Sequence, residues 1–146
     1  MSNPRILALA GSARADSYNH RLVQVAADGA RGAGADVTVL DLKQYPLPIF
    51  DEDLERTGVP ENVAKLKQLF LDHDGLLIAS PEYNSSITPL LKNVIDWVSR
   101  PAEGEASLAA YKGKVAALMA ASPGGLGGLR GLVHVRSILS SIGVIV

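Results

Sequence analysis

Three loops of this chain carry residue types that could bind a negatively charged ligand. The first loop spans Gly11–Asn19 and contains Ser12, Arg14 and Ser17, between an apolar run at 5–10 and a segment of helical periodicity. Backbone N–H groups and the dipole at a helix N-terminus favour an anion, and an arginine adds a forked donor that suits phosphate. We therefore predict a phosphate-binding loop; the alternative is an ordinary helix cap beside a solvated Arg14.

The other two loops follow later apolar runs. The second loop, residues 81–86, joins a stiff proline to Glu82, Tyr83 and Asn84, whose ring, amide and backbone groups could read the edge of a heterocycle. A capped surface turn is the competing interpretation. The third loop, residues 122–128, contains four glycines, which allow the backbone to approach a ligand closely. In open α/β sheets ligands bind outside the carboxyl ends of the strands, so we expect the site at these loops.

Several other kinds of chemistry lack the residues they need. The chain has no Cys, which excludes disulfides, thiolate nucleophiles and zinc–thiolate centres. His20, His73 and His134 lack metal-ligand spacing, and His73 is predicted to pack or cap at its helix. The acidic run at 51–55 is interpreted as a solvated loop rather than a cation site. P-loop, G-x-G-x-x-G and G-x-S-x-G motifs are missing, so we predict no catalytic side chain and no metal.

Strands and helices must alternate along the chain to position these loops. Short apolar runs predict strands at 5–10, 37–40, 75–79 and 114–120. Apolar residues at helical spacing predict helices at 19–31, around 63–73, at 88–98 and at 128–142. Thr88 and Pro89 suit the N-cap and first position of the third of these helices. The buried face of the first helix is predicted to contain Leu22, Val25, Ala26 and Ala30.

This alternation implies a parallel sheet with helices on both faces. The sequence shows no internal repeat and no linker, so residues 1–146 are predicted to form a single domain. Residues 143–146 resemble the beginning of a fifth strand. Because a doubly wound sheet normally covers such a strand with a further helix, we expect the domain to be truncated at this point.

Charge and hydropathy exclude two classes of partner. The 14 basic and 15 acidic residues give a net charge of −1, so we expect neither nucleic-acid binding nor attraction to a membrane surface. No segment reaches the roughly 20 apolar residues of a membrane span. The apolar run at 6–10 is shorter than the roughly 7–15 residues of a signal-peptide core, so a cytoplasmic location is predicted.

Two motifs are specific enough to indicate a family. Gly11-Ser12-x-Arg14-x-x-Ser17-x-Asn19 and Pro81-Glu82-Tyr83-Asn84, the latter followed by Pro89-Leu90-Leu91-Lys92-Asn93-x-Ile95-Asp96-Trp97, resemble the NADPH-dependent FMN reductase family. The resemblance covers essentially the whole chain and is strongest to the soluble quinone and chromate reductases. It implies a flavodoxin-like, doubly wound, five-stranded parallel sheet of order 2-1-3-4-5. Ala121 departs from the pattern, since relatives often have a small hydroxyl residue there.

The resemblance also implies a cofactor, FMN, and the residues that bind it. These residues are Ser12, Arg14, Ser17, Tyr18 and Asn19 in the first loop, where the phosphate is held; Pro81, Glu82, Tyr83 and Asn84 along the isoalloxazine ring; and Ser122 and Gly124 at the other edge of the ring. The implied reaction passes a hydride from NADPH or NADH through FMN to a small acceptor, such as a quinone, an azo compound, a metal oxyanion or free flavin.

The resemblance further implies a homodimer or homotetramer, with 93–100 and 45–50 as candidate contact surfaces. Two other functions stay open. A flavodoxin-type carrier would bind FMN without reducing anything itself, but such carriers usually offer an acidic docking surface, which a net charge of −1 does not supply. A structural or signalling module that has lost its flavin is the third, and the joint presence of the first- and second-loop motifs counts against it.

Overall fold

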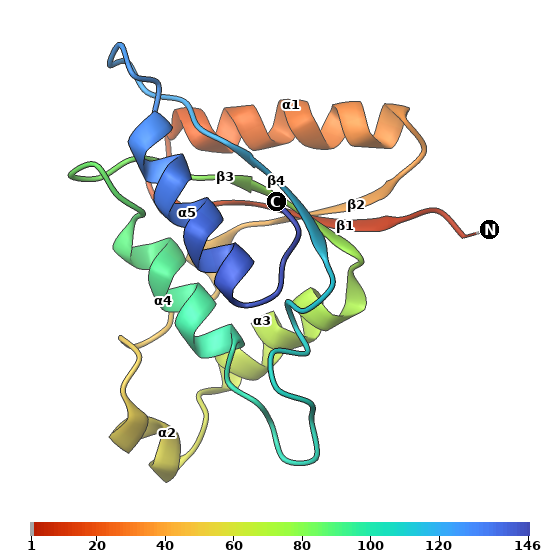
Figure 1. The fold of residues 1–146 in the computed structure, drawn as a ribbon, viewed down its shortest axis with the longest axis vertical. Coiled ribbons are helices and arrows are strands. Elements are labelled where there is room, and N and C mark those ends of the chain that lie inside the picture. The colour runs from red at the N-terminus through yellow and green to blue at the C-terminus, as the bar shows by residue number, and fades with distance from the viewer. Residues whose placement is uncertain (1) are drawn as a thin grey trace.

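The computed structural model describes residues 2–146 and is built on a parallel sheet (Figure 1). The strands are β1 (Arg5–Ala10), β2 (Asp36–Leu40), β3 (Gly75–Ala79) and β4 (Val115–Met119). Their order is β2-β1-β3-β4, and each neighbouring pair runs parallel. The predicted α/β class and parallel sheet are thus confirmed, and each predicted strand end lies within one residue of the observed one.

Helices cover both faces of this sheet, as predicted. They are α1 (Tyr18–Gly32), the 3-10 turn η1 (Leu42–Gln44), α2 (Glu52–Thr57), α3 (Glu61–Asp72), α4 (Pro89–Val98) and α5 (Leu129–Ser141). Helix α1 lies on one face, and α3, α4 and α5 lie on the other (Figure 1). In the part of the chain that the structure describes, no helix is long and apolar enough to cross a membrane.

The predicted count of five strands is not met: the sheet described within residues 2–146 has four. Residues 144–146 lie beside β4 but form one isolated parallel bridge, between Val115 and Ile145. Ile145 donates its N–H to the carbonyl of Lys114 (2.8 Å) and accepts from the N–H of Ala116 (2.8 Å). Within residues 2–146 this bridge does not extend into a ladder, so the described sheet counts four strands.

The two faces of the sheet bury side chains of different size. Because successive residues of a strand point to opposite faces, Leu7 and Leu9 enter the large cluster beneath α3, α4 and α5, whereas Ala8 and Ala10 enter a small cluster beneath α1. The large cluster also holds Tyr111, whose ring lies 5.3 Å from that of Phe70. The small side chains under α1 let that helix lie close to the sheet.

This small-residue face corrects the predicted orientation of α1. Val25 was expected on the buried face but is 70% exposed, whereas Val23 and Ala27 are buried against the sheet. Leu22 and Ala30 pack at the edge of the same cluster. The helix is therefore turned from its expected orientation, because Val23 and Ala27 fit against the alanines of β1. The predicted inward residues of α4, in contrast, are all buried: Leu91, Val94, Ile95 and Val98.

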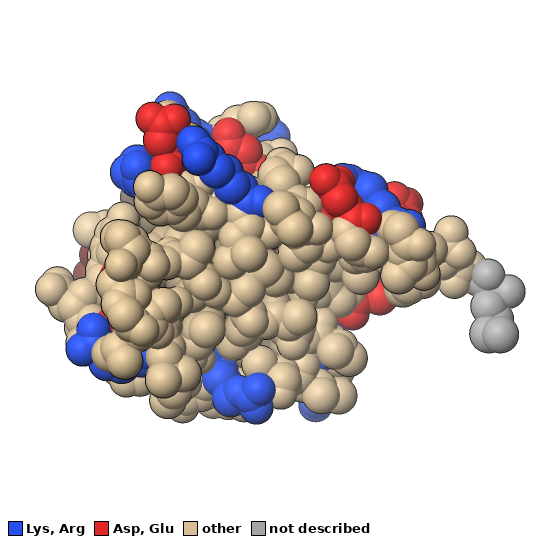
Figure 2. Space-filling view, turned by 90° about the horizontal axis from the view of Figure 1, so that it is seen from above, with Lys and Arg blue, Asp and Glu red and all other residues tan. Residues whose placement is uncertain are grey.

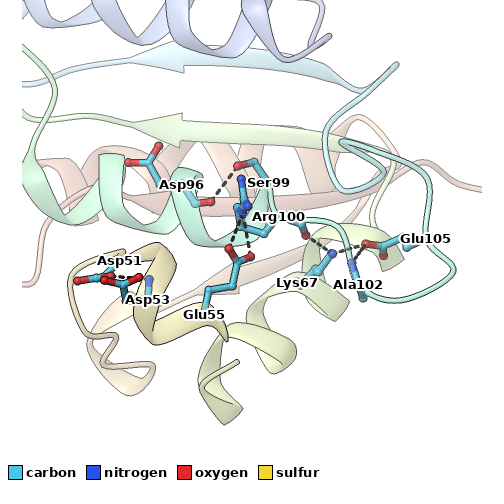
Figure 3. Close-up of polar contacts among 9 residues, drawn as sticks. All are labelled: Asp51, Asp53, Glu55, Lys67, Asp96, Ser99, Arg100, Ala102 and Glu105. Atoms are coloured by element: carbon cyan, nitrogen blue, oxygen red, sulfur yellow. Dashed lines mark hydrogen bonds and ion pairs between the residues drawn. The ribbon is translucent and has the colours of Figure 1, made fainter. Parts of the chain in front are cut away.

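Residues 52–57 form helix α2, so the expectation of a solvated loop across 51–55 is wrong. Asp51 caps this helix, its carboxylate accepting from the N–H of Asp53 (2.7 Å). Glu55 accepts from the guanidinium of Arg100 at 2.8 and 3.1 Å and so ties α2 to the end of α4 (Figure 3). The cap and this long-range ion pair together explain why so short and acidic a segment is helical.

A second ion pair fastens the segment that follows α4. Lys67 of α3 contacts both the carboxylate of Glu105 and the carbonyl of Arg100 (Figure 3). The pair is mostly buried, with the two side chains 11% and 18% exposed. An apolar pocket of about 280 Å³ lies beside it, between α3 and the end of α4. Since the cations at this pocket are already paired, its charged residues are explained by the fold.

His73 has the packing and capping role predicted for it. It ends α3 and is buried, with Nδ1 2.6 Å from the carbonyl oxygen of Leu69 and Nε2 2.9 Å from the hydroxyl of Thr38 on β2. Both ring nitrogens are thus engaged within the fold.

Candidate functional site

Three loops meet at the carboxyl ends of β1, β3 and β4, as a sheet of this order requires. They enclose a pocket of about 210 Å³. Its lining residues are Ser12, Arg14, Ser17, Tyr18 and Asn19 from the first loop, Pro81, Glu82 and Tyr83 from the second, and Ala121, Ser122 and Pro123 at the third. Nine of the eleven predicted site residues therefore line one pocket; Asn84 and Gly124 lie outside its lining.

The first loop begins where the chain passes close to α4. A Cβ at Gly11 would lie 3.0 Å from Cβ of Leu91, so a side chain there would crowd α4. The hydroxyl of Thr88, the N-cap of α4, donates to the carbonyl of Gly11 (2.7 Å). Nε2 of His20 lies 2.7 Å from the carbonyl oxygen of Ser12. These contacts, that of His20 among them, hold the first loop against two helices.

Two buried hydroxyls of the first loop have their hydrogens available to the pocket. Ser12 Oγ accepts from the N–H of Arg14 (3.2 Å), and Ser17 Oγ accepts from the N–H of Asn19 (3.3 Å) as the N-cap of α1. Both serines are buried. A hydroxyl whose oxygen accepts still has an O–H to donate, so both can serve an anionic oxygen in the pocket.

Cationic and aromatic groups stand at the mouth of the same loop. The ring of Tyr18 is half exposed, and the guanidinium groups of Arg14 and Arg21 each lie 5.9 Å from its centroid. The N-terminus of α1 adds the positive end of its dipole. The electrostatics at this end of the pocket therefore favour a phosphate.

Asn19 makes contacts that the sequence did not indicate. Its Nδ2 donates to the carbonyl of Ala121 (3.0 Å), and its Oδ1 accepts from the N–H of Ala121 (2.9 Å). This paired contact joins the first loop to the residue that leads into the third loop. No local signal could have revealed it, because 102 residues separate the two partners.

The second loop makes a tight turn with unusual backbone angles. Tyr83 and Ser86 exchange two backbone hydrogen bonds of 3.0 Å. Between them, Asn84 and Ser85 have φ values of 49° and 65°, in the left-handed region that asparagine tolerates and serine rarely adopts. Such backbone strain clusters at ligand sites. The ring of Tyr83 is half exposed beside the pocket.

Glu82 lines the pocket, and its carboxylate is bonded to helix α5. It accepts from the N–H of Gly131 (3.0 Å) and from Nε of Arg130 (2.8 Å). The Gly131 N–H, helped by the Arg130 guanidinium, holds the pKa of Glu82 below its ordinary value. Because α5 has glycine at its N-cap and no capping side chain, Glu82 supplies the missing acceptor from the second loop.

Two residues at this edge escaped sequence reasoning. Arg130 and His134 of α5 contact the second loop, with Nδ1 of His134 2.8 Å from the hydroxyl of Ser86. Their partners lie 48 residues earlier in the chain, so neither has a local motif. Gly128, at the start of α5, has φ 88° and room for no side chain, since Cβ would lie 2.6 Å from Cβ of Ala120.

The motif on α4 positions a neighbouring segment rather than the pocket itself. Asn93 accepts from the N–H of Phe50 (2.8 Å) and donates to the carbonyl of Pro48 (2.9 Å). The indole N–H of Trp97 donates to the same carbonyl (2.8 Å), and the ring of Phe50 packs edge-on at 4.9 Å. Segment 46–50 is thereby fixed along α4, where Ile49 is 85% exposed.

Comparison with known proteins agrees with this geometry. Residues 4–146 match the family model described as NADPH-dependent FMN reductase. The chain is 37% identical over 135 residues to the NAD(P)H-dependent FMN reductase PA1204 of Pseudomonas aeruginosa, covering 92% of this chain and 69% of that protein. It is 37% identical over 137 residues to an NADPH:quinone oxidoreductase of Arabidopsis thaliana, covering 92% and 65%. The structure of FerB, a flavoenzyme NAD(P)H:(acceptor) oxidoreductase of Paracoccus denitrificans, matches with a TM-score of 0.83 at 32% identity, covering 97% and 74%.

The sheet order and the phosphate-type pocket at its carboxyl edge define a flavodoxin-like binding fold. Within that class, the chain belongs to the NADPH-dependent FMN reductase family. The family resemblance is thus confirmed, and with it the class of chemistry: oxidoreductases that use FMN and NAD(P)H. The chain spans 69% and 65% of the two curated relatives described above.

Proposed function

We propose that this protein binds FMN in the pocket between the three loops and reduces a small acceptor, of the quinone class, with NADPH or NADH. When bound, FMN supplies the hydride chemistry, since it accepts two electrons from a nicotinamide and passes them on. Azo compounds, chromate-type oxyanions and free flavin are further candidate acceptors. Relatives named as quinone oxidoreductases support the quinone class.

One observation carries the proposal: the buried hydroxyls of Ser12 and Ser17 line the same pocket as Arg14 at the N-terminus of α1. Two hydroxyl donors, a guanidinium and a helix dipole form a site for a phosphate. At about 210 Å³ the pocket is smaller than the roughly 300–1,000 Å³ of a whole drug-sized site. It suits the phosphate and its chain, leaving the flavin ring along the second and third loops.

The side chains of this protein then position and orient the cofactor. Pro81, Tyr83 and Asn84 present the strained second loop to one edge of the ring, and Ser122 and Gly124 border the other. The half-exposed ring of Tyr83 leaves one approach to the pocket lined by an aromatic face. Backbone N–H groups of these loops can stabilise negative charge that develops on the ring. No side chain is required as nucleophile or general base.

The test is the visible absorption spectrum of the protein with FMN, followed by NADPH without air and then a quinone. Bands that shift on binding, bleach with NADPH and return with the quinone are expected. Flavin that binds but is not bleached by NADPH or NADH would leave the electron-carrier function instead. Absence of binding would refute the proposal.

Surface charge favours a reductase over a carrier. On the face drawn in Figure 2, acidic and basic side chains lie next to one another around a broad uncharged area. A carrier that docks large redox partners would present a field of one sign. The mixed charges on this face, together with a net charge of −1, suit a small-molecule acceptor.

We further propose that the protein forms a homodimer or homotetramer through segment 46–50 and α4. These elements border a groove of about 420 Å³ lined by Leu47, Ile49 and Leu90, among others, and Ile49 projects from it. Replacing Ile49→Glu should shift the mass measured by light scattering from oligomer to monomer. A wild-type monomer would refute the proposal.

Three further features are proposed with this function: the domain organisation, the location and a fifth strand. Residues 1–146 are proposed to form a single domain, and the protein is proposed to be cytoplasmic, where NAD(P)H is available. The bridge between Val115 and Ile145 supports a fifth strand beginning at residue 144, which would give the order 2-1-3-4-5. Slow amide exchange at Ile145, comparable to that of β4, would be expected of a strand; exchange at the rate of an open loop would count against it.

A further inference from the structure

Asn19 has a side chain that is committed to the protein rather than open to a ligand. It is 4% exposed, and both ends of its carboxamide pair with the backbone of Ala121, at 3.0 and 2.9 Å. Its own N–H donates to the hydroxyl of Ser17. The Asn19 carboxamide thus pairs with the backbone of Ala121 through two hydrogen bonds, as one residue of a β-strand pairs with a residue of its neighbour.

The third loop depends on such an anchor. Residues 122–127 are exposed, and three of them are glycine. The hydrogen bonds from Gly124 N–H to Ser122 Oγ (3.1 Å) and from Gly127 N–H to the carbonyl of Gly124 (3.0 Å) run within the loop itself. Exposed glycine-rich backbone has high conformational entropy, so its position is set at its two ends.

Those two ends are held from opposite sides of the pocket. Asn19 holds Ala121 before the loop, and Glu82 holds Gly131 in the first turn of α5 beyond it. The first and second loops thus each fix one end of the third. Asn19 is the link between the predicted phosphate end of the pocket and the predicted far edge of the flavin ring.

We infer that Asn19 is a positioning residue that acts on flavin binding by fixing the third loop, and not a ligand of the phosphate. The inference rests on the proposed function and refines one residue of it. A phosphate ligand would discriminate FMN from riboflavin, which has the same ring without the phosphate. A residue that positions the third loop would affect both flavins alike.

The experiment compares the dissociation constants of FMN and riboflavin in wild type and Asn19→Leu, a variant of similar size without hydrogen-bonding groups. Both constants should rise by about tenfold, since two modest hydrogen bonds are lost. The absorption spectrum of bound flavin should change as well. Arg14→Met is the matched control: it should weaken FMN and leave riboflavin unchanged. Loss of FMN affinity alone in Asn19→Leu would overturn the inference.

Hydrogen exchange supplies a second readout that needs no flavin. In the apo protein, the amide of Ala121 and the amides of residues 122–128 should exchange faster in Asn19→Leu than in wild type, while those of β1 stay unchanged. Unaltered exchange there would overturn the inference. If wild type bound neither flavin, the proposed function would fail, and this exchange result would still decide the role of Asn19. Should Asn19→Leu not fold, Asn19→Ser, too short to reach both groups of Ala121, replaces it.

Discussion

At the scale of single residues, Tyr111 stands out because its hydroxyl is buried without a hydrogen-bonding partner among residues 2–146. Its side chain is fully buried. Burial, with the Asp96 carboxylate acting in the same direction, raises the pKa of Tyr111 far above its ordinary value. The phenol is therefore neutral, and its unpaired O–H is a cost to the folded state.

Removing that hydroxyl should stabilise the protein. Tyr111→Phe keeps the ring that packs on Phe70 and should raise the free energy of unfolding by about 1 kcal/mol. Urea denaturation measures the change. Tyr45→Phe, at a half-buried position, is the control and should leave stability nearly unaltered. A loss of stability in Tyr111→Phe would mean that the hydroxyl does find a partner.

Gly128 is the residue at which the third loop turns into α5. Its left-handed φ of 88° and the 2.6 Å approach to Ala120 leave no room for a methyl group. Gly128→Ala should lower the free energy of unfolding by about 2 kcal/mol and weaken FMN binding. Gly125→Ala, in the same loop with open space around its Cβ position, should change neither; equal effects of the two substitutions would contradict the steric argument.

At the scale of elements, the pair of Lys67 and Glu105 fastens the segment after α4 to α3. The pKa of Glu105 is lowered, chiefly by its hydrogen bond with Lys67 and then by the N–H of Ala102. A lowered pKa means that the ionised carboxylate stabilises the fold above the ordinary value of 4.5, and that this stability is lost as the pH falls through the folded value.

Glu105→Gln should therefore lower the free energy of unfolding at pH 7 by about 1–2 kcal/mol. The difference from wild type should shrink below pH 4.5, where the Glu105 carboxyl of the unfolded chain protonates before that of the folded protein. Thermal unfolding followed from pH 7 to pH 3 measures both effects. Glu103→Gln, exposed in the same segment, should match wild type at every pH. A difference at pH 3 as large as that at pH 7 would rule out ionisation as the cause.

Some elements could be predicted from sequence because their signals are local. The strands follow from short apolar runs, and the start of α4 follows from Thr88 and Pro89. Helix α1 was turned wrongly because Val23 and Val25 fit a helical period equally well; the alanine face of the sheet decides between them. Helix α2 was missed because its ion pair to Arg100 spans 45 residues.

In the candidate site, too, features with local signals could be predicted and long-range contacts could not. The topology of parallel sheets correctly predicted that the three loops meet, and nine of the predicted residues line the pocket between them. The contacts that hold the loops, from Asn19 to Ala121 and from Glu82 to Gly131, join residues 102 and 49 positions apart. Contacts between residues so far apart produce no periodicity or spacing in the sequence, so only the structure reveals them.

At the scale of the whole molecule, ligand binding should be measurable as stability. A ligand that binds the folded state alone stabilises it in proportion to the logarithm of its concentration. FMN at a hundred times its dissociation constant should add about 2.7 kcal/mol and raise the unfolding temperature by several degrees. Riboflavin at the same concentration should raise the unfolding temperature less, because it lacks the phosphate that the first loop is proposed to hold. Calorimetry with each flavin tests this, and equal shifts would argue against a phosphate site.

Trp97 is the one tryptophan of this chain, and it is fully buried where α4 packs on segment 46–50. Intrinsic fluorescence excited at the indole band therefore has one origin of known surroundings. A red shift of that emission would report loss of packing between α4 and this segment. Flavins absorb where indole emits, so quenching by energy transfer would follow cofactor loading without any label. The packing of Trp97 thus gives the protein a built-in optical sensor for both folding and binding.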